Sequence, residues 1–598
     1  MTVFDELVFL ENHFMEERRS GRKMADLYES VQHAAHIIPR LYLMITVGSA
    51  YIKTKEAKAS FVLKDLLEMV KGVQQPIRGL FLRFYLLKTV KDLLPDKGNE
   101  YEDDENDVTD SIDFILKNFK EMNRLWIRLQ YMSSQKDEYK KEEERDELKT
   151  TVGENIYRLS SLEGLTVDLY KTKVLPYILD TLIVCEDVMS HQFLIECVIN
   201  SFPDEFHLAT LQPLLEGISK LHKDVDIKTT VITLLDRLSE VASSSETNIF
   251  KLVQKYIEEI FIRFNSKMES NLVIQVSLLN FCIKCYPKET ENINSILESS
   301  VNLIKRSREE KLNPESMRLL VKLLSIPLDT LSLRILEMPQ YPMLLKYMAY
   351  NGRRTVSLRI VKAVFKSKRK IDNIEILNQL LSFVEPLIKD DENNEEEPEV
   401  YEFVEEQESV AKLIHLVYND DLDAYYNILQ RIKKELVQGG IKRMKYTLPS
   451  FIFNLFKFIY ALDYCITKNK ERTNPRPGDY SEEEEEDKSN LPKVPSITIQ
   501  KVFYQINELL GLITSAYPEI TLRLFLQAAQ VIDNINNNAD LEDLSYDFIS
   551  TSLIVYQDEL SDSDEKLRAI KLIVATISHL QAFEHDNYDT LASNAAQY

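Results

Sequence analysis

The chain has 598 residues, a net charge of −23 and only 13 glycines. Its length exceeds the roughly 250–300 residues at which a single hydrophobic core stops growing, so it must form several domains or a repeat array. The negative charge disfavours bulk attraction to nucleic acid or anionic lipid, and no nucleic-acid-binding signature offsets it. The five cysteines are few and lie in apolar helical patterns, which favours a reducing compartment over a disulfide framework.

The sequence also argues against export and membrane insertion. Its N-terminus, MTVFDELVFLENHF, carries acids where a signal peptide would carry lysines. No run reaches the roughly 18 uninterrupted apolar residues that a spanning helix needs. The richest runs are broken by Arg40 in one case, and by Asn454 and Lys457 in another. We therefore expect a soluble, cytoplasmic protein.

Helical patterns of about 12–20 residues follow one another along the chain. The first covers 4–15 and stops near Gly21, a second at 77–87 follows Pro76, and a third covers 114–126. Breaks recur about every 15–25 residues, so helix pairs repeat about every 35–45, as in helical solenoids. We predict an all-α, irregular HEAT-like solenoid. Prolines are expected at the starts of helices, namely Pro39, Pro76, Pro176, Pro213, Pro449 and Pro518.

Two helical patterns meet within residues 21–52, where Pro39 suits the first turn of the second helix. That helix is apolar nearly all round, so it must be covered on more than one side. Its exception is Arg40, a cation in a first turn, where it opposes the helix dipole. We expect Arg40 to have a carboxylate neighbour or an external partner. An ion pair between helices and a surface that shapes a docking site are both open interpretations.

Acidic segments interrupt the series at 96–110, 390–407 and 471–495. They hold too few large apolar residues to order themselves, so we interpret them as loops, most simply solvated spacers. The predicted organisation is a solenoid over 1–389, an acidic loop at 390–407 and a second solenoid over 408–598. A fourth charged stretch, 135–149, mixes signs and is interpreted as the exposed extension of a helix.

The search for catalytic, cofactor and metal motifs is negative. There is no G-x-G pair, phosphate loop, H-E-x-x-H or G-x-S-x-G. Cys282 and Cys285 form one C-x-x-C without the second pair that zinc requires, so two small apolar residues in a helix are the favoured interpretation. His33 and His36 lack an acidic third ligand nearby in sequence. We predict no catalytic residues, no cofactor and no metal.

A single tryptophan and a run of basic residues each allow a structural or a binding role. Trp126, the single tryptophan, lies on an apolar stripe, so core packing is favoured over a ligand platform. The run 353–370 holds eight Lys and Arg residues without an acid. It can meet an acidic partner or a membrane surface, but a plain solvated helix face is the favoured interpretation.

The box PRLYL, formed by Pro39, Arg40, Leu41, Tyr42 and Leu43, resembles the marker of the large scaffold subunit of retromer, the endosomal sorting coat. Similar blocks continue in the family's order along the chain: VQQPIRGLFLRFYLL at 73–87, EMNRLWIRLQ at 121–130, FPDEFHL at 202–208, TLPSFIF at 447–453, LRLFLQ at 522–527 and YQDELSDS at 556–563. A match of this extent is far more specific than one short motif.

The resemblance implies a non-enzymatic scaffold that supports cargo retrieval from endosomes to the trans-Golgi network or plasma membrane. It implies that an arrestin-fold subunit docks near 23–94, with the box 39–43 as its marker, and that a phosphoesterase-fold subunit sits on the C-terminal half. Sorting nexins, a Rab-family GTPase and cargo tails are further implied partners. Membrane contact is expected to be indirect, on the cytosolic face of endosomes, and no nucleic acid is expected.

The chain departs from the resembled family at both ends, since relatives carry helices before Met1 and beyond Tyr598. We therefore expect the phosphoesterase-fold seat to be reduced and self-association to be weak. The alternative is a HEAT-like regulatory adaptor of another complex, such as a phosphatase scaffold or transport receptor. That alternative would show regular repeats and acidic inner-face stripes, and neither is clear in the sequence.

Overall fold

The computed structural model describes residues 2–102, 107–131, 138–242, 249–264, 267–307, 312–331, 334–335, 338–389, 399–473, 496–536, 541–581 and 585–597. Over these residues the protein is helical, and the one β pairing is an isolated bridge between Ile371 and Val417. The predicted all-α class is confirmed.

The chain divides into two compact units, Met1–Ser307 and Arg308–Tyr598. The first contains α1 (Thr2–Arg19), α2 (Met24–Gln32), α3 (Ile37–Lys53), α4 (Ala59–Val70), α5 (Pro76–Val90), α6 (Val108–Arg128), η1 (Leu129–Tyr131), α7 (Glu138–Ser160), α8 (Val167–Leu169), η3 (Tyr170–Val174), α9 (Leu175–Cys185), α10 (Val188–Ser201), α11 (Asp204–Ala209), α12 (Leu211–Ser219), α13 (Ile227–Val241), α14 (Phe250–Phe264), α15 (Met268–Cys285) and α16 (Thr290–Ser307).

The second unit contains α17 (Pro314–Ser325), α18 (Leu328–Leu331), α19 (Gln340–Lys346), α20 (Tyr350–Ser367), α21 (Ile374–Ile388), α22 (Val400–Ile414), α23 (Leu422–Gln438), α24 (Ile441–Thr473), α25 (Ile499–Gly511), α26 (Pro518–Asn534), α27 (Glu542–Asp558), α28 (Ser563–His579) and α29 (His585–Ala596). The organisation predicted from the sequence, two solenoids over 1–389 and 408–598, stays a prediction.

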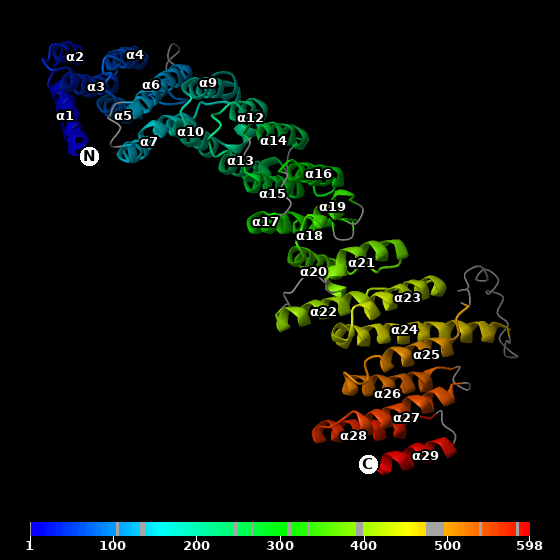
Figure 1. The fold of residues 1–598 in the computed structure, drawn as a ribbon. Coiled ribbons are helices and arrows are strands. Elements are labelled where there is room, and N and C mark those ends of the chain that lie inside the picture. The colour runs from blue at the N-terminus through cyan, green and yellow to red at the C-terminus, as the bar shows by residue number, and fades with distance from the viewer. Residues whose placement is uncertain are drawn as a thin grey trace, which may run out of the picture. The chain divides into compact units, whose positions relative to one another are not determined.

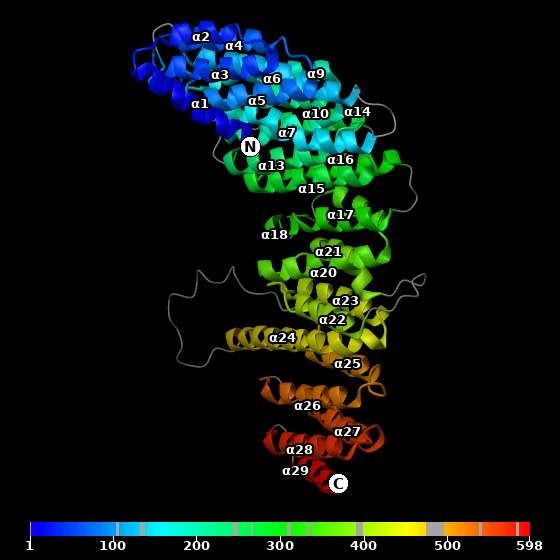
Figure 2. The same cartoon turned by 90° about the vertical axis from the view of Figure 1, so that its left-hand side faces the viewer.

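Within each unit, a helix packs on the next helix and on the next but one (Figure 1, Figure 2). In the first unit α3 contacts α4 and α5, α4 contacts α6, and α5 contacts α6 and α7. In the second unit α20 contacts α21 and α22, and α21 contacts α23. Such contacts between near neighbours in sequence are the pattern of stacked helical repeats.

The predicted helix starts at prolines are confirmed in part. Pro76 and Pro518 are the first residues of α5 and α26. Pro176 is the second residue of α9, as predicted, and follows a π-helical turn. Pro449, however, lies inside α24. This prediction is wrong because an interior proline, costing about 3 kcal/mol, is tolerated where neighbouring helices bury the rest of the helix.

The acidic segments are only partly loops. Of 96–110, residues 103–106 lie outside the described residues, and α6 already begins at Val108. Asp96 is buried rather than projecting, because its carboxylate accepts the backbone N–H groups of Glu163 and Gly164 at 3.2 and 3.1 Å. This carboxylate therefore joins two connections far apart in sequence.

The other two acidic segments also run into helices. Residues 390–398 lie outside the described residues, but α22 begins at Val400, so the rest of the predicted loop 390–407 is wrong. Its Glu406 is buried and pairs with Arg354 at 2.7 Å, which supplies the tertiary reason. Of 471–495, the first three residues belong to α24, and 474–495 lie outside the described residues.

Trp126 lies in the core, as predicted, and is fully buried. Its indole N–H donates to the carbonyl of Arg145 at 2.9 Å, and the Arg145 guanidinium lies 5.3 Å from its ring centroid. Arg145 pairs with Asp187 at 2.6 Å, with both side chains buried. Residues 135–137 of the charged stretch 135–149 lie outside the described residues, and the rest belongs to α7, with Arg145 buried instead of exposed.

We expect Asp187→Ala to lower the free energy of unfolding of this region by about 3–5 kcal/mol, because it leaves the Arg145 charge buried without a partner. Asp146→Ala breaks the exposed pair with Lys149 and is the control, with an expected loss of about 0–1 kcal/mol. The measurement is urea unfolding followed by the fluorescence of the single tryptophan. Equal shifts of the two midpoints would contradict this account.

Candidate partner-docking region

The PRLYL box lies where α2 ends and α3 begins. Two contacts fix α2 against the following helices. The backbone N–H of Met24 donates to Glu56 at 3.0 Å, and the Tyr28 hydroxyl donates to Asp65 at 2.6 Å. Burial and this carboxylate both raise the pKa of Tyr28, so its hydroxyl stays a proton donor. The region is therefore a fixed helix–turn–helix.

Arg40 joins the two helices of this turn. Its Nη1 donates to the carbonyl oxygen of Gln32, the last residue of α2, at 3.3 Å. Among the described residues the expected carboxylate neighbour is wrong, because the partner is a backbone acceptor, and the alternative of an external partner stays a prediction. The physical reason is that a helix leaves its last carbonyls without an internal partner and carries partial negative charge there. A cation unfavourable at the start of α3 is favourable at the end of α2.

The next two box residues are held in the core. Leu41 is buried, and the ring of Tyr42 lies 5.3 Å from that of Tyr85 on α5. The hydroxyl of Thr46 donates to the Tyr42 carbonyl at 2.8 Å and also lies 2.8 Å from the Tyr85 hydroxyl. Burial raises the pKa of Tyr42 and of Tyr85, so both stay neutral. These side chains fix α3 on α5.

The outward part of the region is small and apolar. Pro39 is exposed, Leu43 is half-buried, and Ile37, the first residue of α3, is 59% exposed. Sequence reasoning missed Ile37, although it lies one turn before Leu41 on the same helix face. At the start of α3, neighbouring helices do not cover this face. The box thus divides into a buried part that holds the helices and an exposed part that faces solvent.

The cysteines and histidines considered as metal ligands do not form a site in the structure. Cys282 is buried, and burial raises its pKa to about 12; burial also raises the pKa of Cys285. Neutral thiols are poor metal ligands and nucleophiles. His33 and His36 are exposed in the turn. Within the described part of the chain, no group of three or more potential ligands could hold a metal.

Three cations of the basic run 353–370 pair with acids of other helices, and one of these pairs joins Arg354 to Glu406. Lys362 contacts Glu405 at 2.5 Å, and Lys366 contacts Asp329 at 3.6 Å. Lys370 lies 4.2 Å from the ring centroid of Tyr418. These contacts neutralise part of the charge from α22 and α18, and a plain solvated helix face stays the favoured interpretation of the run.

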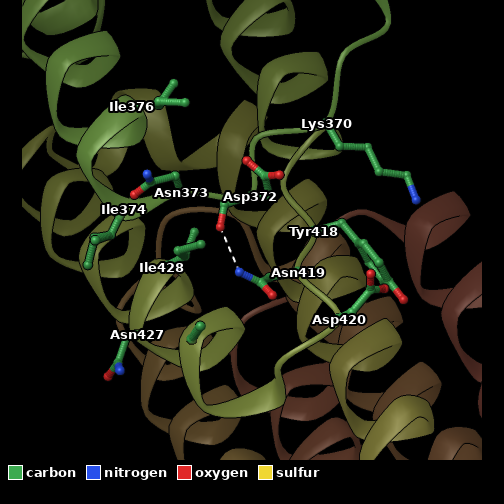
Figure 3. A pocket seen from close by; sticks show the side chains of 11 residues that line it. Lys370, Asp372, Asn373, Ile374, Ile376, Tyr418, Asn419, Asp420, Asn427 and Ile428 are labelled. Carbon is green, nitrogen blue, oxygen red and sulfur yellow. Dashed lines mark hydrogen bonds between the residues drawn. The ribbon is translucent and has the colours of Figure 1, made fainter. Parts of the chain in front are cut away.

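A hollow of about 630 Å³ in the second unit lies between the segment before α21, the segment after α22, and α23 (Figure 3). The side-chain amide of Asn419 donates to the carbonyl of Asp372 at 2.7 Å across it. Its lining mixes one lysine, two aspartates, amides and isoleucines, with no cysteine, serine or histidine. The described lining therefore holds no Ser–His or Cys–His pair of the kind used in nucleophilic catalysis.

Helix α24 is apolar and long enough to cross a membrane over Ile441–Lys470, judged by length and composition alone. Of the most apolar window, 56% is buried inside the protein. The helix packs on α22 and α23, and its Asn454 is fully buried, donating to the carbonyl of Ile414. This is the position of a core helix, which passes the same test.

Stacked helices with near-neighbour contacts, and exposed turns that project from them, define a helical-repeat scaffold. Comparison with known proteins shows which family this scaffold belongs to. The family described as vacuolar protein sorting-associated protein 35 matches residues 1–598. The chain is 36% identical to vacuolar protein sorting-associated protein 35A of Arabidopsis thaliana, over 100% of this chain and 74% of the relative. It is 35% identical to vacuolar protein sorting-associated protein 35 of Dictyostelium discoideum, over 99% of this chain and 74% of the relative.

The chain therefore belongs to the vacuolar protein sorting-associated protein 35 family. The resemblance predicted from the PRLYL box and the later blocks is confirmed along the whole chain. The chain is a scaffold subunit of retromer, a complex with further subunits that is associated with endosomes. The alternative of an unrelated regulatory adaptor is not favoured.

We expect Arg40→Ala to loosen the turn between α2 and α3 without unfolding the unit, since one hydrogen bond contributes about 1 kcal/mol. Hydrogen exchange should accelerate over 33–40 and stay unchanged in α6. Arg78→Ala, which removes an exposed arginine from α5, is the matched control and should change neither segment. Unchanged exchange over 33–40 in Arg40→Ala would show that the contact with Gln32 does not hold the turn.

Proposed function

We propose that the α2–α3 turn is the docking site of an arrestin-fold retromer subunit, and that the chain acts as a scaffold without a catalytic step. The observation that carries this proposal is the contact between Arg40 and the Gln32 carbonyl. It fixes the end of one helix against the start of the next, directly beside the exposed side chains of Ile37 and Pro39. A preformed apolar surface binds with less loss of conformational entropy than a flexible one.

In this proposal the box residues act in two ways. Ile37 and Pro39 contact the partner, whereas Arg40, Leu41 and Tyr42 keep that surface in place. A small apolar patch beside a rigid turn has the character of a binding hot spot, where a few well-placed side chains supply most of the affinity. Loss of the arginine would then weaken docking indirectly, through the geometry of the turn.

The remaining partners are proposed from family membership alone. They are a phosphoesterase-fold subunit on the C-terminal half, together with sorting nexins, a Rab-family GTPase and cargo tails. We further propose that the chain acts in the cytoplasm, on the cytosolic face of endosomes, and reaches the membrane only through partners. The excess of acidic residues supports indirect contact, because an anionic membrane surface repels negative charge.

The absence of catalysis is likewise a proposal, and two observations support it. The thiols of Cys197 and Cys282 have raised pKa values of about 12, so neither is an activated nucleophile. The buried His191 and His207 have lowered pKa values and bind backbone carbonyls, which are structural roles. In this proposal the chain acts by binding different partners at separate places on its surface.

We expect Arg40→Glu to reduce capture of the arrestin-fold subunit by at least about tenfold, because a carboxylate at this position repels the carbonyl end of α2. Circular dichroism should show near-normal helical content. The measurement is pull-down or calorimetric titration with the purified subunit, and Arg306→Glu, at an exposed arginine of α16 outside 23–94, is the charge-matched control. Undiminished capture would reject the box as a determinant of docking.

A second variant separates direct from indirect contact. Ile37→Asp removes exposed apolar surface without touching the Arg40 contact, so we expect weaker capture with unchanged hydrogen exchange over 33–40. If Ile37→Asp binds as well as the unaltered chain while Arg40→Glu does not, the partner contacts a different face of the region.

A further inference from the structure

A hollow of about 210 Å³ lies in the first unit, where the C-terminal ends of α5 and α7 meet. These two helices pack on one another (Figure 1, Figure 2). Three cationic and two apolar side chains line the hollow together with one acid: Lys88, Lys91, Arg158, Phe84, Leu87 and Glu154. On a chain with a net charge of −23, this is a local positive site.

The cations of the hollow are positioned but not neutralised. Arg158 donates through Nη2 to the Lys91 carbonyl at 2.6 Å and through Nη1 to the Ser161 hydroxyl at 3.0 Å. Lys88 lies 5.7 Å from the ring centroid of Phe4. Among the described residues, none of the three cations forms an ion pair with a carboxylate within 4 Å. The guanidinium is thus held in place by neutral acceptors, with its charge left for a ligand.

Other lysines of the same unit show the contrast. Lys53 pairs with Glu11 at 2.6 Å, Lys64 with Asp110 at 3.1 Å, and Lys173 with Asp113 at 2.7 Å. The charge of each of these three lysines is neutralised by a carboxylate, whereas the three cations of the hollow lie together without such a pair.

An exposed apolar face of α5 leads into the hollow. Ile77 and Phe81 are 39% and 41% exposed, and Phe84 is half-buried. These three residues and Lys88 are spaced at i, i+4, i+7 and i+11, which places them on one face of the helix. The combination of an apolar stripe and a cationic end fits a peptide that carries both aromatic and acidic side chains.

We propose that the hollow between α5 and α7 binds an acidic, aromatic-containing peptide segment of a partner protein. Carboxylates enter between Lys88, Lys91 and Arg158, where charge-assisted hydrogen bonds form. The aromatic side chain lies against Phe81 and Phe84 on α5. This occupant is favoured over a lipid headgroup because a headgroup would leave the apolar stripe unused, and because the acidic chain is repelled by an anionic bilayer.

The inference deepens the scaffold function by adding a partner class, and it uses no residue of the PRLYL box. The test uses the full chain and a fluorescein-labelled peptide in which glutamates flank two phenylalanines. A second peptide has glutamine at each glutamate position. We expect the first peptide to bind in a fluorescence anisotropy titration, and the second to bind at least about tenfold more weakly, because the charge-assisted contacts are lost.

The hollow is tested with the double variant Lys88→Glu and Lys91→Glu, which should weaken binding of the acidic peptide by at least about tenfold. The control is Lys223→Glu with Lys251→Glu, two exposed lysines of the same unit outside the hollow, with the same change of charge. The control should bind the acidic peptide like the unaltered chain. Raising the salt concentration should weaken peptide binding by the control and by the unaltered chain.

Three results would overturn the proposal. Equal weakening in the control would show nonspecific charge attraction, and equal binding of the glutamine peptide would show that the cations are not used. Binding of phosphatidylserine vesicles that is lost in the Lys88 and Lys91 variant, without peptide binding, would assign the hollow to a membrane surface. Capture of the arrestin-fold subunit is measured in parallel: failure of the box proposal appears in the Arg40 variant, and failure of this one appears in the Lys88 and Lys91 variant.

Discussion

Most stability of a helix in a folded protein comes from packing its apolar face on neighbouring helices, not from the intrinsic preference of its residues. The contacts of α3 with α1, α2, α4 and α5, and those of α5 with α6 and α7, provide this packing locally. Burial of this kind leaves the turns and the outer faces free. The exposed side chain of Ile37 and the hollow at Lys88 both lie at helix ends, where neighbouring helices no longer cover the surface.

Stacking creates a second problem, because every helix end brings carbonyl groups that lack an internal partner. Arginines from neighbouring segments meet this need repeatedly in both units. Arg40 binds the end of α2, Arg158 the end of α5, Arg237 the end of α10, and Arg443 the last turn of α21. The guanidinium suits this role because it remains charged and presents several donors. These contacts tie together elements that apolar packing alone would leave free to slide.

Much of the fold could be predicted from the sequence. Apolar spacing at three and four residues identified α1, α5 and α6, and the ordered blocks beginning with the PRLYL box identified the family. The failures have a common cause. Pro449 lies inside α24, and residues 400–407 are helical although only Glu406 and Gln407 among them are buried. The contacts that hold these helices come from other helices, which the composition of a segment does not reveal. Burial of Asp96 and Arg145 was missed for the same reason.

The features of the candidate site also differ in whether the sequence alone could predict them. The sequence by itself determined an acidic, all-α repeat scaffold of the vacuolar protein sorting-associated protein 35 family, because helical periodicity and ordered motifs are properties of the chain alone. Only the tertiary structure decided that Arg40 binds a carbonyl rather than a carboxylate, that Ile37 faces solvent, and that the cations of α5 and α7 surround one hollow. The reason is that each of these depends on which side chains of another helix come within hydrogen-bonding or van der Waals distance.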